Sequence, residues 1–228
     1  MDSTRLRDNL EAIRTRIADA SRQAGRDPAG VTLVAVTKRR PPGASRILAS
    51  LGTVDQGENY PQELWAKAEA LADAPIRWHL IGHLQGNKAK KTLPICAMIH
   101  SVDSLKLLET LAGLAREGPA RVTACLQVNA SGEASKHGWS PDGLLADAEA
   151  IAAVAGLPVV GLMTIAAADV DPRPAFARLR QLRDSLRERT GLALPELSMG
   201  MSGNFEAAVA EGATLVRIGS ALFEGEGP

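Results

Sequence analysis

Two patterns of apolar residues alternate along the chain: short continuous runs, and longer stretches where apolar residues recur at helical spacing. From Leu6 to about Ala24 the spacing predicts a helix, which Gly25 and Pro28 end. Strand-like runs follow near 31–37, 53–57, 76–81, 95–102, 121–128, 157–165, 196–199 and 214–218. Helical patterns fill the gaps near 43–51, 60–72, 86–92, 103–117, 140–155, 172–190 and 203–211.

Eight strands, nearly all followed by a helix and without a long linker, predict a (β/α)₈ TIM barrel with an extra N-terminal helix. We expect residues 1–228 to form a single domain. A doubly wound open sheet is the alternative, because periodicity alone does not separate the two. The runs 53–57 and 196–199 are the weakest strands, since both are short and polar. Little chain follows the last strand, so the N-terminal helix is expected to cover the position of an eighth helix.

The charge balance narrows the range of partners. Lys and Arg together number 26, as do Asp and Glu, so the formal net charge is zero. We therefore expect no nucleic-acid partner and no membrane partner.

Cys96 and Cys125 lie in apolar runs, typical of core thiols in a reduced compartment, and no apolar signal segment is visible. A cytoplasmic monomer is expected.

Lys38 ends the apolar run that begins at Val31. A lysine at the carboxyl end of a buried strand points its amine into the mouth of an α/β fold, where ligands bind. Burial there would lower the pKa of the amine, as a Schiff-base lysine requires. The alternative is a solvated side chain that extends along the surface.

The last two strands end in turns rich in Gly and Ser, at 198–204 and 217–220. Backbone N–H groups and hydroxyls converge in such turns and bind phosphate, and the corresponding loops of barrels are a frequent phosphate site. The alternative is that these residues serve only to make tight turns. A strand-end amine facing a phosphate site predicts a ligand with both an aldehyde and a phosphate, and pyridoxal 5′-phosphate (PLP) has both.

The chain resembles the pyridoxal phosphate homeostasis protein family, single-domain relatives of the alanine racemase barrel (fold-type III). Seven segments carry the resemblance, in order along the chain: 36–38 (VTK), 57–60 (GENY), 78–88 (WHLIGHLQGNK), 135–138 (SKHG), 161–163 (GLM), 197–202 (LSMGMS) and 217–223 (RIGSALF). The resemblance implies that Lys38 forms a Schiff base with PLP and that Arg217 faces the pyridine nitrogen. It implies phosphate contacts from Ser202, Gly219 and Ser220, and a pocket lined further by Asn59, His79, Met163 and Ser198.

Several positions depart from the family pattern. Gly86 stands where Ser is common, and Gly203-Asn204 follow Ser202 where an acidic residue is common. Ser220 replaces a more usual Thr and keeps the hydroxyl, and the tail after Phe223 lacks the common basic residue. These departures bear on the phosphate contacts of the 198–204 loop and remove no group that the cofactor needs.

Arg217 and the tyrosine count together argue against turnover. A guanidinium stays protonated and leaves the pyridine nitrogen unprotonated, which weakens the cofactor as an electron sink. Racemases that resemble this barrel add a second base, a tyrosine from a C-terminal domain, whereas this sequence has one tyrosine, Tyr60. We expect a non-catalytic PLP carrier or buffer, with apo-enzymes that use PLP as candidate recipients. The alternatives are an amino-acid racemase and an interaction module that has lost the ligand.

Two histidine motifs remain. His79 and His83 lie four residues apart but flank a strand and its turn, so they do not share a helical face, and no Cys or carboxylate completes a zinc set with them. No metal site is predicted. His137 is compatible either with the rim of the pocket or with a surface loop.

Overall fold

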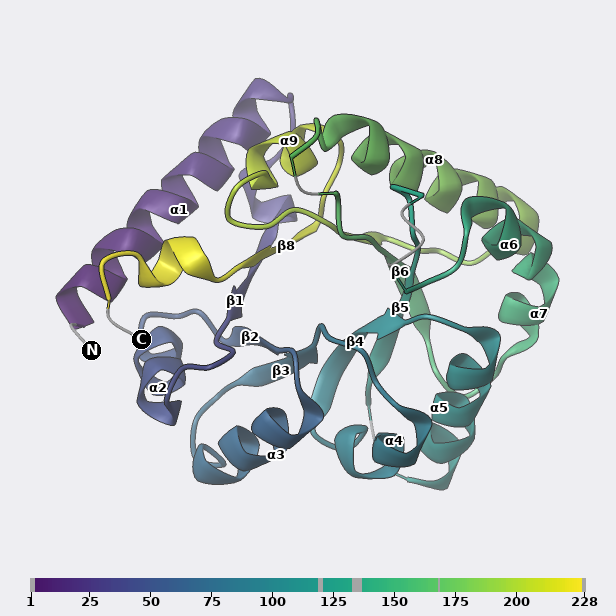
Figure 1. The fold of residues 1–228 in the computed structure, drawn as a ribbon, viewed down its shortest axis with the longest axis horizontal. Helices are drawn as coiled ribbons and strands as arrows, with labels where there is room; N and C mark the ends of the chain where they lie inside the picture. The colour runs from purple at the N-terminus through teal and green to yellow at the C-terminus, as the bar shows by residue number, and fades with distance from the viewer. Residues whose placement is uncertain (1–2, 119–120, 133–136, 168, 227–228) are drawn as a thin grey trace.

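The predicted (β/α)₈ barrel is confirmed. The computed structural model describes residues 3–118, 121–132, 137–167 and 169–226. Eight parallel strands follow one another in sequence order around a closed barrel, and β8 pairs with β1 (Figure 1). They are β1 (Thr32–Val36), β2 (Asp55–Glu58), β3 (Arg77–Leu80), β4 (Cys96–Val102), β5 (Thr123–Gln127), β6 (Val159–Met163), β7 (Glu196–Ser198) and β8 (Leu215–Ile218).

Helices surround the strands (Figure 1). They are α1 (Ser3–Gln23), α2 (Pro42–Ser50), α3 (Pro61–Ala70), α4 (Gly86–Thr92), α5 (Leu105–Glu117), α6 (Pro141–Ala146), α7 (Ala148–Ala153), α8 (Arg173–Thr190) and α9 (Phe205–Ala210), with short 3₁₀ helices η1 (Pro28–Gly30) and η2 (Ser220–Phe223). Within the described residues, no helix is long and apolar enough to cross a membrane.

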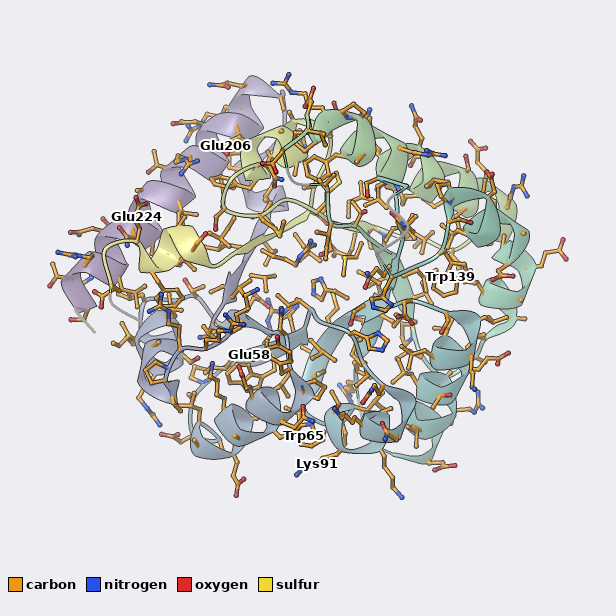
Figure 2. The ribbon with its side chains drawn as sticks, in the orientation of Figure 1. Glu58, Trp65, Lys91, Trp139, Glu206 and Glu224 are labelled. Carbon is orange, nitrogen blue, oxygen red and sulfur yellow. The ribbon has the colours of Figure 1, made fainter. Side chains whose placement is uncertain are left out.

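The single helix predicted over 140–155 is wrong, because the chain breaks it into α6 and α7 at Asp147. This residue has ψ near 2°, away from the helical value, and its carboxylate accepts a 2.8 Å hydrogen bond from Trp139 Nε1. Figure 2 labels Trp139 on the inner side of these two helices. Asp147 therefore serves as a contact with Trp139 rather than as a residue inside a continuous helix.

The N-terminal helix closes the ring of helices, as predicted. One face of α1 buries Leu6, Leu10 and Ile13 in the core, and α1 lies beside α9 and η2 (Figure 1). The Nδ2 atom of Asn9 donates 3.0 Å hydrogen bonds to the carbonyls of Leu222 and Glu224. The start of the chain thus holds the segment that follows β8.

The two weakest predicted strands both form as β2 and β7, and the polarity of β2 has a structural cause. All four residues of β2 are buried, including the side chains of Gln56 and Glu58. Gln56 Nε2 donates to the carbonyls of Ser45 and Thr53, and Glu58 pairs with Lys67 of α3. Buried polar side chains are retained when they have partners, so a polar sequence here is compatible with a core strand.

Candidate functional site

A cavity of about 580 Å³ opens at the carboxyl ends of the strands. This is the end of a parallel barrel at which binding sites are built. The structure brings together in its lining six of the predicted site residues: Lys38, Asn59, Ser202, Arg217, Gly219 and Ser220.

Lys38 lies directly beyond β1, and a buried ion pair holds the strand end beneath it. Lys67 Nζ donates a 2.6 Å hydrogen bond to the carbonyl of Thr37 and also pairs with Glu58, labelled in Figure 2. The hydroxyl of Thr37 donates to the same carboxylate at 2.8 Å. After Lys38 the chain turns through a left-handed conformation at Arg39 (φ 59°). These contacts fix the point from which the amine extends.

The expected burial of Lys38 is wrong, because its side chain is exposed at the cavity. The run from Val31 is also less buried than predicted, since Thr32 and Leu33 are only half-buried. The amine is therefore available to a ligand that enters from solvent.

The loops after β7 and β8 converge in the same cavity. The backbone N–H groups of Gly219 and Ala221 both donate to Ser202 Oγ, at 3.3 and 3.2 Å. A Cβ at Gly219 would lie 3.3 Å from the Cβ of Val36, so the close approach of β8 to β1 favours glycine there. Convergent N–H groups beside hydroxyls suit an anion with several oxygens, so this arrangement fits a phosphate.

The unusual Gly203-Asn204 pair shapes the loop after β7. Asn204 Oδ1 accepts a 2.8 Å hydrogen bond from the N–H of Met201, which ties the loop to itself. Gly200 has φ +93°, and a Cβ there would come within 2.6 Å of Ala208. Asn204 thus organises the loop that presents Ser202, in place of the acidic residue common in the family.

Arg217 forms part of the cavity floor and is almost fully buried. Its two terminal nitrogens donate to Ser198 Oγ at 2.6 Å and to the carbonyl of Thr164 at 2.9 Å. Burial lowers the pKa of Arg217 to about 10, so the guanidinium remains protonated at neutral pH. The floor of the cavity therefore carries a fixed positive charge.

A chain of buried hydrogen bonds runs from Arg217 through the barrel interior. Ser198 Oγ lies 2.7 Å from His100 Nδ1, and His100 Nε2 lies 2.8 Å from His79 Nδ1. His79 Nε2 lies 2.9 Å from an oxygen of Asp55. We call Ser198, His100, His79 and Asp55 the histidine relay.

The direction of each hydrogen bond in the relay is set by the two groups at its ends, the donor Arg217 and the acceptor Asp55. Because Arg217 donates to Ser198, the hydroxyl proton is directed to His100 Nδ1. His100 then carries its proton on Nε2 and donates to His79, which donates from Nε2 to Asp55. Burial, followed by the electrostatic influence of His79 and Arg217, holds the pKa of His100 well below its usual value, in keeping with a neutral imidazole. The relay thus fixes both tautomers and braces the Arg217 side chain.

The far end of the relay reaches solvent at Arg77, which donates to Asp55 at 2.5 Å. Burial raises the pKa of Asp55, but the hydrogen bonds from His79 and Arg77 outweigh it, and the net pKa is lowered. Asp55 is therefore a carboxylate at neutral pH and the acceptor at which the relay ends.

Three predicted site residues do not belong to the cavity lining. His79 and Ser198 lie in the relay beneath Arg217, and Met163 is buried at the end of β6. Ser135 and Lys136 of the 135–138 motif lie outside the described residues.

Sequence reasoning missed His100 and Asp55, and it missed Gln127 in the lining. The signal for His100 was an imidazole inside the otherwise apolar run 95–102. His83, which sequence reasoning assigned to no site, lines the cavity. His137 lines it too, which agrees with the first of its two predicted alternatives, the rim of the pocket.

Comparison with known proteins identifies the family of the chain. Residues 8–226 match the family model described as alanine racemase, N-terminal domain. The chain is 46% identical to the Pyridoxal phosphate homeostasis protein of Pseudomonas aeruginosa, over 95% of this chain and 94% of that protein. It is 40% identical to the human protein of the same name, over 94% of this chain and 84% of that protein.

Solved structures give the same result. PipY of Synechococcus elongatus, described as having PLP bound, superposes with a TM-score of 0.85 at 35% identity, covering 96% of this chain and 99% of that one. An unknown protein from Bifidobacterium adolescentis superposes with a TM-score of 0.91 at 39% identity, over 98% and 97% of the two chains. Alanine racemase from Corynebacterium glutamicum shares the fold at 17% identity and a TM-score of 0.71, over 94% of this chain and 61% of that one.

Proposed function

The chain belongs to the alanine racemase N-terminal domain family and, within it, to the pyridoxal phosphate homeostasis proteins, and from this premise we propose that it binds PLP as a Schiff base on Lys38. In this proposal it acts as an intracellular carrier or buffer of PLP and not as an enzyme. The observation that carries the proposal is a single cavity that joins an exposed strand-end amine, a buried guanidinium and two convergent backbone N–H groups.

Each anchor of PLP has a counterpart in the cavity. The aldehyde requires an amine, which Lys38 supplies, and the phosphate requires donors, which the loops around Ser202 and Gly219 supply. Arg217 on the cavity floor is the donor for the pyridine nitrogen. In the proposal Asn59 completes the pocket, and His79 and Ser198 act from below by holding Arg217. Met163, buried at the end of β6, belongs to the barrel core beside the pocket.

Arg217 also limits the chemistry. PLP, when bound, supplies an electron sink whose strength depends on protonation of its pyridine nitrogen. A protonated pyridine nitrogen would need a hydrogen-bond acceptor beside it. Arg217, with a pKa near 10, stays protonated and acts only as a hydrogen-bond donor, as it does towards Ser198 and Thr164. The pyridine nitrogen therefore stays unprotonated, which disfavours carbanion chemistry.

The resemblance to racemases calls for a tyrosine as a second base, and no tyrosine lies among the described residues that line the cavity. Tyr60 is the one tyrosine of the sequence; its side chain is exposed and does not line the cavity. Stereochemical inversion requires proton transfer on both faces of the substrate carbon, and Lys38 serves one face. We therefore propose retention of PLP without substantial turnover.

Two assays test this function. The first loads the protein with PLP and measures transfer to an apo-enzyme against the same concentration of free PLP; the carrier proposal expects restoration of activity from the bound pool. The second incubates the loaded protein with L-alanine and D-alanine and expects no racemisation. Efficient turnover that disappears in Tyr60→Phe would overturn the carrier proposal and favour an enzyme.

We also propose a cytoplasmic location. Cys96 and Cys125 are free and buried, as expected of thiols that pack in a core in a reduced compartment.

A further inference from the structure

Three potential metal ligands converge at the mouth of the cavity. His83 follows β3, Asp103 follows β4, and His137 lies between β5 and α6. Each offers one ligand atom, and these atoms all lie within 4.8 Å of one another. His83 Nδ1 lies 2.9 Å from Asp103 Oδ2, and the rings of His83 and His137 stack with centroids 4.9 Å apart.

Two neighbouring contacts hold His83 in place. The preceding residue, Gly82, packs so closely on the loop after β2 that a Cβ would overlap the carbonyl of Asn59. The carbonyl of Gly82 also accepts a 2.6 Å hydrogen bond from Ser101 Oγ at the end of β4. The position from which the His83 imidazole extends is therefore set by backbone packing.

His137 is held by the end of β5. Gln127 Nε2 donates a 3.0 Å hydrogen bond to the carbonyl of His137, and the N–H of Trp139 donates to the carbonyl of Gln127 at 2.9 Å. Gly138 has φ +112°, and a Cβ there would lie 2.5 Å from the same Gln127 carbonyl. The glycine thus permits the close approach that brings His137 to His83.

We propose that His83, Asp103 and His137 bind a divalent transition-metal ion of the zinc class. Two imidazoles and one carboxylate are ligands that Zn²⁺, Co²⁺ and Ni²⁺ accept, and the exposure of both histidines leaves the remaining positions to water. In this proposal the ion takes the place of the proton between His83 and Asp103. Sequence inspection overlooked the set because it paired His83 with His79, whereas Asp103 and His137 are distant in the chain.

Competing ligands are engaged elsewhere. His79 and His100 belong to the buried relay. Cys96 and Cys125 are buried, and burial raises the pKa of the Cys96 thiol to about 12, which disfavours the thiolate that a metal requires. Among the described residues, His83, Asp103 and His137 are the group whose ligand atoms gather in this way.

The proposed metal site is independent of the Schiff-base proposal, because its three ligands include neither Lys38 nor any residue proposed to contact the phosphate. It is nevertheless adjacent to PLP binding, since His83 and His137 line the same cavity as Lys38. A bound ion would link three consecutive loops of the barrel across that mouth.

The test is calorimetric titration of the untagged, full-length, metal-free protein with ZnCl₂, with Co²⁺ absorption as a second readout. We expect one ion per chain. The variants His83→Ala, Asp103→Asn and His137→Ala should each weaken binding by at least about tenfold, since even changes outside the ligand set commonly cost that much. The matched control Asp73→Asn removes an exposed carboxylate that pairs with Arg46 and should bind as the unaltered protein does.

Two results would overturn the proposal. One is the absence of stoichiometric Zn²⁺ binding, and the other is Zn²⁺ binding in all three variants as tight as in the unaltered protein. In either case the cluster would be held together only by the hydrogen bond between His83 and Asp103 and by the stacking of His83 on His137. Lys38→Ala should retain Zn²⁺ binding, so a failure of the PLP proposal is distinguishable from a failure of this one. Circular dichroism confirms that each variant is folded.

Discussion

At the scale of single residues, the strand-end positions were predictable and the buried relay was not. Lys38, Ser202 and Arg217 lie at or just beyond the carboxyl ends of strand-like runs, and in a barrel such positions share one face, so sequence order alone groups them. The pairing of His79 with His100 depends on the register of β3 against β4, which no sequence spacing encodes. The sequence left burial and solvation of Lys38 as alternatives, and the exposure that the structure shows depends on the loops around it.

The phosphate contact gives the first prediction. Ser202→Ala removes the oxygen on which the N–H groups of Gly219 and Ala221 converge, and with it a donor to phosphate. PLP retention should weaken by about 1–3 kcal/mol, the range for a hydrogen bond to a charged group. Equilibrium dialysis measures the change. Ser50→Ala, on the outer surface of α2, is the control, and pyridoxal lacking phosphate should bind far more weakly; equal affinity for PLP and pyridoxal would contradict the assignment.

The relay gives the second prediction, on pH. The pKa of His100 is lowered in the fold, so the unfolded chain binds the proton first as the pH falls below about 6.5. The stability that neutral His100 contributes is present above that pH and is lost as the pH falls towards the folded-state pKa, by up to about 1.4 kcal/mol per unit. Urea unfolding from pH 7 to 5, with a chelator present, should show this slope. The pH dependence of the free energy of unfolding should become weaker in His100→Gln and persist in the control His83→Asn. An unchanged pH dependence in His100→Gln would exclude His100 as its source.

At the scale of elements, the order of strands and helices was predictable because hydrophobic period and turn residues agree along most of the chain. The break between α6 and α7 was not, since it depends on Trp139 reaching Asp147. The short polar strand β2 was uncertain for a related reason. Its polar side chains are buried because α2 and α3 supply their partners.

The pair between β2 and α3 gives the third prediction. Burial, opposed by Lys67, raises the pKa of Glu58, and Lys67→Met would leave this buried carboxylate without its cationic partner, with only the hydrogen bond from Thr37. The free energy of unfolding should fall by about 3–5 kcal/mol, as for other broken buried pairs. Lys90→Met, on the exposed side of α4, is the control and should change stability by less than about 0.5 kcal/mol. The double variant Lys67→Met, Glu58→Gln should lose less than Lys67→Met alone. If the double variant lost as much free energy of unfolding as Lys67→Met alone, the unpaired carboxylate would not be the cause of the destabilisation.

At the scale of the whole molecule, the barrel brings together groups from opposite ends of the chain. Lys38 follows the first strand, Arg217 lies in the last, and Ser202 and Gly219 follow the last two. Pairing of β1 with β8 nevertheless makes these residues neighbours around one cavity. The N-terminal helix stabilises that closure by packing on the segment after β8. Sequence predicted the closure and the face of the site, whereas the loop contacts that define the cavity required the structure.

The most direct test of the account is to identify the residue that holds PLP. The protein is loaded with PLP, reduced with borohydride, digested and analysed by peptide mass spectrometry. We predict a reduced adduct on Lys38, and in Lys38→Ala we predict loss of the visible absorption of the Schiff base with residual binding through the phosphate contacts. An adduct on Lys88, Lys90 or another lysine in place of Lys38 would contradict the account.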